Sequence, residues 1–260
     1  MKNQGAKVTL LAAASRGRRR LMEEIRNLRR RRNESELTRQ RLLSTWVRPG
    51  TRVFDLGANV GELTEVFVRL GGEVVAVEPH PRCVTELRRR FHRSKNVSIV
   101  AAAASDEIGT AELHLGSITE VSTLSTRFRT AYQDQPGGVH WSEVVQVRTT
   151  TLDALIGRFG MPGFAKLDLE GHEPDALEGL SRPIPALSIE YNARLREESL
   201  RCIERLDAIA APGRYRWNFS PYESYVLSLD SWLTGEAMRA WLSSLSPDLE
   251  TGDVYGEYLP

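Results

Sequence analysis

The chain has 260 residues, enough for one large domain with a sizeable core or for one domain with appendages. No apolar run approaches the roughly 20 residues of a membrane-spanning helix, and 20 Gly and 12 Pro exclude a collagen-like or broadly disordered chain. The net charge of +1 conceals an asymmetry. Residues 1–41 hold 13 Lys/Arg against 4 Asp/Glu, a balance of +9, which leaves 22 against 30, a balance of −8, for the rest.

Residues 1–46 are predicted to form a basic helical N-terminal arm. Apolar residues recur at helical spacing over residues 18–32, and Asn33 with Glu36 has capping-box spacing for a second helix that runs up to Trp46. Such an arm suits phosphate, anionic lipid or an acidic polymer, but no aromatic residue interleaves with its arginines. Nucleic acid is therefore not expected as a partner, while peripheral membrane contact and a solvated helix face remain open.

The compartment is expected to be the cytoplasm. The apolar stretch VTLLAAA near the start is short for the core of a signal peptide, and an arginine cluster follows it. Cys83 and Cys202 lie far apart and match no metal or redox spacing, so we expect free thiols.

From residue 47 to 260 the chain alternates short apolar strands with helices. Strands are expected at 51–57, 73–79, 97–104, 164–171 and 186–192, and helices at 62–71, 81–94, 173–180 and 196–210. Apolar strands separated by helices predict a doubly wound α/β fold, with a parallel sheet that is covered on both faces.

Two stretches depart from this alternation. Between about 110 and 150 the segments 111–116 and 143–149 resemble strands around a polar loop, which predicts a β insert. After Pro212 the segments 215–221 and 224–230 predict a C-terminal antiparallel β-hairpin.

The first strand ends in DLGANVG and opens into a helix, as is typical of a nucleotide-binding turn. Glycine allows positive φ and a close approach of the backbone to a ligand, so we expect a ligand against this turn. The candidate cofactor-binding residues here are Asp55, Gly57, Ala58, Asn59, Gly61 and Thr64.

Acidic residues also follow the next two strands. Glu78 ends the second strand, where a carboxylate suits the two hydroxyls of a ribose. Ser105 and Asp106 follow the third strand, and Asp106 is expected to accept a hydrogen bond from an adenine amino group. NAD enzymes share this geometry, so these acids alone do not choose a cofactor.

The turn itself favours S-adenosylmethionine over NAD. The dinucleotide fingerprint has a glycine where this chain has Asn59, and here Asp55 precedes the turn. An acid and an amide disfavour a pyrophosphate but suit an amino group. S-adenosylmethionine combines ribose, adenine, an ammonium and a sulfonium without phosphate. The alternatives are a NAD-type Rossmann oxidoreductase and a non-catalytic cofactor-binding protein that acts through the basic arm.

The densest polar cluster is KLDLEGHE at residues 166–173. Strand alternation places Lys166, Asp168 and Glu170 on one face, and an internal strand rarely buries three charges without a function.

At this point the sequence resembles a known family. DLGANVG, VEP, AAASD, TTTLDAL, KLDLEGHE and LSIEYN, in this order, are similar to the FkbM-type S-adenosylmethionine-dependent methyltransferases over roughly residues 50 to 195. The resemblance implies a seven-stranded Rossmann-like methyltransferase fold with a C-terminal β-hairpin. It also implies O-methylation, often of sugar, glycan or natural-product hydroxyls. The arm and the segment after about residue 200 lie outside it.

An alcohol acceptor generally needs a base, and the candidates are His172, Glu170 and Asp168. Asp168 is also expected near the methionine end of the cofactor. Although Glu173 completes a set of carboxylates that suits Mg²⁺, no metal is expected, because simpler roles account for two of the three.

Other candidates for substrate contact lie further along the chain. They are His140 and Trp141 in the insert, as part of a lid; Tyr191 and Asn192 after the fifth strand; and the aromatic residues Trp217, Phe219 and Tyr222. A surface loop and ordinary core packing are the alternative interpretations of these residues.

Overall fold

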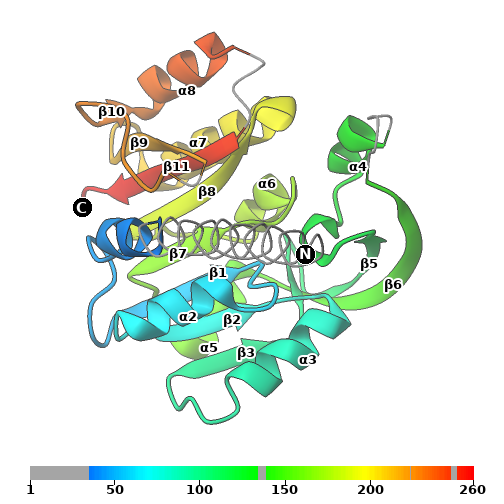
Figure 1. Cartoon of the computed structure of the whole chain (residues 1–260). Coiled ribbons are helices and arrows are strands. Elements are labelled where there is room, and N and C mark those ends of the chain that lie inside the picture. Colours follow the sequence, from blue (N-terminus) through cyan, green and yellow to red (C-terminus); the bar gives the residue numbers. More distant parts are fainter. Residues whose placement is uncertain (1–34, 134–138, 223, 247–250) are drawn as a thin grey trace, which may run out of the picture.

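The computed structural model describes residues 35–133, 139–222, 224–246 and 251–260 (Figure 1). The predicted helix over residues 18–32 and the predicted cap at Asn33 lie outside these residues. Within the described part of the chain, no helix has both the length and the apolar character needed to cross a membrane.

A twisted sheet forms the centre of the protein. In the order of the sheet, its strands are β10 (Leu233–Thr234), β9 (Tyr215–Pro221), β11 (Thr251–Tyr258), β8 (Ala186–Asn192), β7 (Phe164–Leu167), β1 (Arg52–Leu56), β2 (Glu73–Val77) and β3 (Val97–Val100). The strands from β8 to β3 are parallel, and β11 is antiparallel to both β8 and β9. This confirms the predicted doubly wound fold, with seven main strands and the two-residue β10 at one edge.

Helices cover both faces of this sheet (Figure 1). They are α2 (Glu62–Arg69), α3 (Pro81–Arg90), α5 (Leu152–Phe159), α6 (Glu173–Glu178), α7 (Arg196–Ala210) and α8 (Gly235–Ser244), and residues 35–43 are helical as well. Residues 35–47, α2 and α3 pack on one face, which we call the α2 face, and α5 to α8 pack on the other.

The two faces differ in polarity. On the α2 face β1, β7 and β8 each begin apolar and become polar two residues later, as Phe164 gives way to Lys166 and Ala186 to Ser188. On the opposite face the same strands stay apolar, for example at Leu167. Side chains two residues apart share one face of a strand, and the polar residue comes later in each pair. The polar half of the α2 face therefore lies toward the carboxyl ends of the parallel strands.

A small second sheet forms the insert. Its strands are β4 (Ala103–Ala104), β6 (Trp141–Thr150) and β5 (Gly109–Gly116), and the β5–β6 pair is antiparallel, as expected for 111–116 and 143–149. A 3₁₀ turn, η1 (Thr119–Val121), and α4 (Thr126–Tyr132) follow β5. Figure 1 shows this green unit beside the carboxyl ends of β1 and β7.

The C-terminal antiparallel strands differ in detail from the prediction. The partner of β9 is β11 rather than residues 224–230, which form no strand in their described part. The interior of β11 contains Gly252 and Gly256, and a Cβ there would lie 2.4 Å from the Phe219 ring and 2.6 Å from the Trp217 ring. The large rings of β9 therefore require glycine on the neighbouring strand, although glycine is unfavourable in a strand sequence.

Candidate active site

Two cavities meet at the turn between β1 and α2. The Glu78 cavity lies between the ends of β2 and β4 and residues 119–124 of the insert. The Glu190 cavity lies over the polar half of the α2 face and is the larger, at about 380 Å³ against about 150 Å³. Both are lined by Gly57, Asn59, Glu120 and Asp168, so these residues mark the place where the cavities meet.

The glycines of the turn are explained by contacts within the protein. Gly57 has φ +83°, and a Cβ there would lie 1.8 Å from the backbone oxygen of Asp168. Gly61 has φ +84°, and its Cβ would lie 2.5 Å from the Phe91 ring and 2.7 Å from Leu87. A ligand was predicted to lie against these glycines, but the atoms that approach them are those of Asp168, Leu87 and Phe91. Gly61 is not among the residues that line the two cavities.

Asp55 lies at the end of β1 and borders the Glu190 cavity, as does Ala58. The Thr64 hydroxyl of α2 donates a hydrogen bond to Asp55 Oδ2, and both side chains are buried. Burial raises the pKa of Asp55 to about 6, although the Thr64 hydrogen bond acts in the opposite direction. Thr64 therefore positions Asp55 and does not itself reach either cavity.

Glu78 faces the cavity named after it. Its carboxylate accepts hydrogen bonds from the backbone N–H of Asn59 and of His80, each at 2.7 Å. Burial raises the pKa of Glu78 to about 7. The apolar side chains Leu113 and Leu124 line the same cavity. Among the described residues, no Lys or Arg lines it, so it fits a nucleoside without phosphates better than a dinucleotide.

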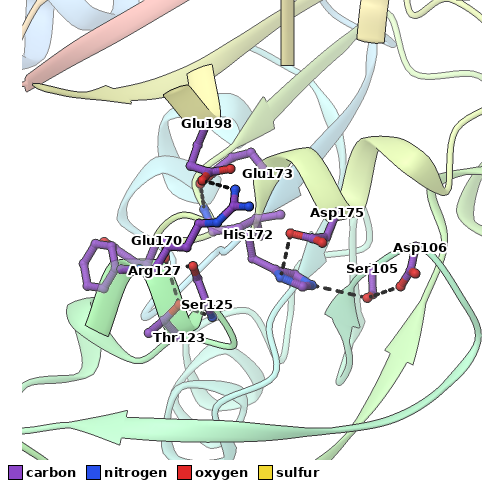
Figure 2. A network of polar contacts seen from close by, with 12 residues as sticks. Ser105, Asp106, Thr123, Ser125, Arg127, Glu170, His172, Glu173, Asp175 and Glu198 are labelled. Carbon is purple, nitrogen blue, oxygen red and sulfur yellow. Dashed lines mark hydrogen bonds and ion pairs between the residues drawn. The ribbon is translucent and has the colours of Figure 1, made fainter. Parts of the chain in front are cut away.

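His172 belongs to a polar network that Figure 2 shows at close range. Its Nε2 lies 3.2 Å from Ser105 Oγ, and its Nδ1 lies 3.4 Å from Asp175 Oδ2. The Ser105 hydroxyl donates to Asp106 Oδ1 at 2.9 Å. Burial lowers the pKa of His172, while Asp175 and Asp106 act to raise it. His172 borders the Glu78 cavity, whereas Ser105 and Asp106 stand behind its wall.

Charged side chains gather where the cavities meet. The Lys166 ammonium lies 2.9 Å from Asp253 Oδ1 and 3.4 Å from Asp168 Oδ2. Burial opposes the charge of Lys166, but these carboxylates raise its pKa above the usual value. Glu170 borders the Glu78 cavity from a backbone with φ +52°, and its carbonyl accepts a hydrogen bond from the Thr123 hydroxyl at 2.8 Å.

Glu190 is a site residue that the sequence analysis missed. It lies on β8 and faces the cavity named after it, with its oxygen close to those of Asp168 and Glu170. Burial, and then the neighbouring carboxylates, raise the pKa of both Glu170 and Glu190 well above the usual value. The signal was present in ALSIEYN, where Ser188, Glu190 and Asn192 alternate with apolar residues and thus share one strand face.

The prediction that Tyr191 contacts the substrate is wrong, and Asn192 does not line either cavity. Tyr191 is fully buried on the opposite face of the sheet, edge-on to Phe219. The Asn192 amide donates to the Tyr132 hydroxyl, and its oxygen accepts from the backbone N–H of Arg194. These contacts hold α4 and the chain after β8.

The aromatic candidates divide between core and cavity. Trp217 and Phe219 belong to the apolar core, whereas Tyr222 lines the Glu190 cavity. His140 is exposed, and Trp141 Nε1 donates to the carbonyl of Val121 at 2.9 Å. Trp141 thus braces the segment that forms one wall of the Glu78 cavity.

A Rossmann-like sheet with an acidic cavity at the turn after its first strand is typical of S-adenosylmethionine-dependent methyltransferases. The chain belongs to the family described as the methyltransferase FkbM domain, whose family model matches residues 55–233. Its cofactor is S-adenosylmethionine, and the NAD-type alternative is set aside.

Individual relatives are more distant. The chain is 39% identical over 56 residues to a probable ribosomal RNA small subunit methyltransferase A of Methanosarcina mazei. The aligned segment covers 22% of this chain and 21% of the relative. It thus spans about a fifth of the length of the curated relatives that it matches.

Solved structures show similarity at low identity. A precorrin-6y C5,15-methyltransferase from Geobacter metallireducens is 9% identical, covers 85% of this chain and 87% of its own, and has a TM-score of 0.45. An O-methyltransferase from Bacillus cereus in complex with SAH is 14% identical, covers 87% and 80%, and has a TM-score of 0.42.

Proposed function

We propose that the protein transfers a methyl group from S-adenosylmethionine to a hydroxyl of a sugar, glycan or natural product. The observation that carries this proposal is the charge of the Glu190 cavity. Among the described residues, its lining includes six carboxylates, of Asp55, Glu62, Glu120, Asp168, Glu190 and Asp253, against the two basic side chains of Arg39 and Lys166. Such a surface disfavours the phosphate backbone of RNA and favours an acceptor that offers hydroxyl groups.

The residues of the Glu78 cavity fit the nucleoside part of the cofactor. Glu78 suits the ribose hydroxyls, and the apolar wall with Leu113 and Leu124 suits the adenine ring. Asp55 and Asn59 lie on the side of the turn that suits the cationic amino-acid end. When bound, the cofactor supplies an electrophilic methyl group. This orientation directs the reacting carbon toward the meeting of the cavities at Asp168.

We assign removal of the proton from the acceptor hydroxyl to the carboxylates where the two cavities meet. Asp168 and Glu170 border the meeting point, so their carboxylate oxygens are the acceptors closest to the expected position of the reacting hydroxyl. Both ring nitrogens of His172 already face partners, so we assign it to positioning the wall of the Glu78 cavity. Asp106 acts through Ser105 in the same network.

The experiment is a measurement of S-adenosylhomocysteine release with a panel of acceptors. The panel contains neutral sugars, glycans, hydroxylated natural products and ribosomal RNA fragments. We expect transfer to a hydroxylated small molecule or glycan, and at least a 100-fold loss in Asp168→Asn. Glu204→Gln, an exposed carboxylate of α7, is the matched control.

Transfer to RNA without transfer to any hydroxylated small molecule would overturn the proposed acceptor class. Cofactor binding without transfer to any member of the panel would favour the non-catalytic alternative.

A further inference from the structure

Three carboxylates from two strands converge where the cavities meet. Asp168 and Glu170 follow β7, and Glu190 lies on β8. Each offers one oxygen, and these three oxygens lie within 4.8 Å of one another. Glu173 is not part of the group, because its carboxylate accepts the backbone N–H of Leu169 at 2.5 Å. The set of acids considered from sequence is thus replaced by another that includes Glu190.

The three carboxylates span both cavities. Glu170 borders the Glu78 cavity, Glu190 borders the Glu190 cavity, and Asp168 borders both. A ligand bound between them would therefore touch the reacting end of the cofactor and the acceptor together.

The available cation does not neutralise this group. Lys166 is shared between Asp253 and Asp168, at 2.9 and 3.4 Å. Within the described residues, the side chains of Glu170 and Glu190 have neither a hydrogen-bond donor nor an ion-pair partner. Carboxylates this close repel one another unless protons or a cation lie between them.

A second feature of the same cavity indicates a ligand. Ser188 precedes Glu190 by two residues on the same strand face, and it is only 1% exposed. It lines the Glu190 cavity, and its hydroxyl has no partner in the part of the chain that the structure describes. The Ser188 hydroxyl thus faces the cavity and is available to hydrogen-bond a ligand atom or water there.

We propose that Asp168, Glu170 and Glu190 bind one divalent cation of the kind that prefers oxygen ligands, Mg²⁺ or Mn²⁺. Three protein oxygens leave further positions of an octahedral ion for water and for a hydroxyl of the acceptor, next to Ser188. The role of this cation in methyl transfer rests on the proposed function. The cation eases loss of the hydroxyl proton to the second, non-ligating oxygen of Asp168 or Glu170. The new O–CH₃ bond then forms, and the S–CH₃ bond breaks to leave a neutral thioether.

The site is tested by titrating the full chain with Mn²⁺, followed by electron paramagnetic resonance of the free ion. We expect one Mn²⁺ per chain, at least tenfold weaker binding in Glu190→Gln, and unchanged binding in the control Glu204→Gln. Far-UV circular dichroism confirms that each variant is folded. Glu190→Asp keeps the charge and is expected to retain part of the affinity.

Wild-type binding weaker than millimolar, or equal binding in Glu190→Gln, would overturn the site. The titration needs neither cofactor nor acceptor, so its failure is distinguishable from failure of the proposed function. If Mn²⁺ binds as expected but only RNA is methylated, the cation site stands and the proposed acceptor is wrong.

Discussion

The Glu78 cavity and the Glu190 cavity share one turn but are built in different ways. The Glu78 cavity takes its polar groups from short motifs at the ends of successive strands, such as DLGANVG and VEP. The Glu190 cavity takes its floor from β7, β8 and β11, where Lys166 pairs with Ser188 and Glu190 pairs with Asp253 of the sequence-distant β11. Residues of the proposed cofactor site can therefore be predicted from motifs in a single sequence. Those of the proposed acceptor site depend on which residues pair between neighbouring strands.

The substitution with the largest expected effect breaks both cavities at once. In Gly57→Ala the added Cβ lies 1.8 Å from the Asp168 carbonyl oxygen, on a backbone with φ +83°. We expect a loss of about 3 kcal/mol or more in the free energy of unfolding, measured in urea, and loss of cofactor binding.

Gly50→Ala is the matched control for this variant. Gly50 has φ +84°, but nothing lies within 4 Å of its Cβ position, so only the backbone conformation contributes. We expect a loss of about 1 kcal/mol. Equal losses in the two variants would contradict the packing role of Gly57.

The next substitution separates the cavities. Glu78→Ala removes the carboxylate from the Glu78 cavity only, and with it the two charge-assisted hydrogen bonds that we propose to the ribose hydroxyls. Calorimetry is expected to show roughly 100-fold weaker binding of S-adenosylmethionine. Mn²⁺ binding is expected to stay within about twofold, since its proposed ligands are unaltered. A parallel loss of both affinities would show that the cavities are not independent.

Acid is expected to weaken cofactor binding through the same residue. The pKa of Glu78 is about 7, so its carboxylate is ionised above that pH and becomes protonated below it. A protonated carboxyl accepts ribose hydroxyls poorly, so affinity should fall up to about tenfold from pH 8 to pH 6. Glu78→Gln serves as the control, because its remaining pH dependence belongs to the cofactor and to other groups. An unchanged slope in Glu78→Gln would refute the assignment.

The smallest effects compare two buried hydroxyls, Thr64 on α2 and Ser188 on β8. Thr64→Val removes the donor to the buried Asp55 and is expected to cost about 1–2 kcal/mol in the free energy of unfolding. Ser188→Ala removes a hydroxyl without a partner among the described residues, so the change should stay within about 0.5 kcal/mol. Thermal and urea unfolding of both variants measure this contrast, and a large loss in Ser188→Ala would reveal a structural role for that hydroxyl.

Much of the architecture was predictable because its signals are local. The unbroken apolar strands and the amphipathic helices between them predicted the parallel sheet. The position of Glu78 directly after β2 predicted its place in the Glu78 cavity. The strand at 251–258 was not predicted, because its glycines are required by packing against aromatic rings of β9 that are distant in sequence. Glu190 was missed for a related reason. Its role depends on which face of β8 meets the turn, and that is decided by pairing with β7 and β11.

The most direct test of the account is a crystal structure of the protein with S-adenosylhomocysteine. We expect the ribose hydroxyls on Glu78, the adenine against Leu113 and Leu124, and the sulfur at Asp168, facing Glu190. A nucleoside bound in the Glu190 cavity, or a sulfur directed away from Asp168, would contradict it.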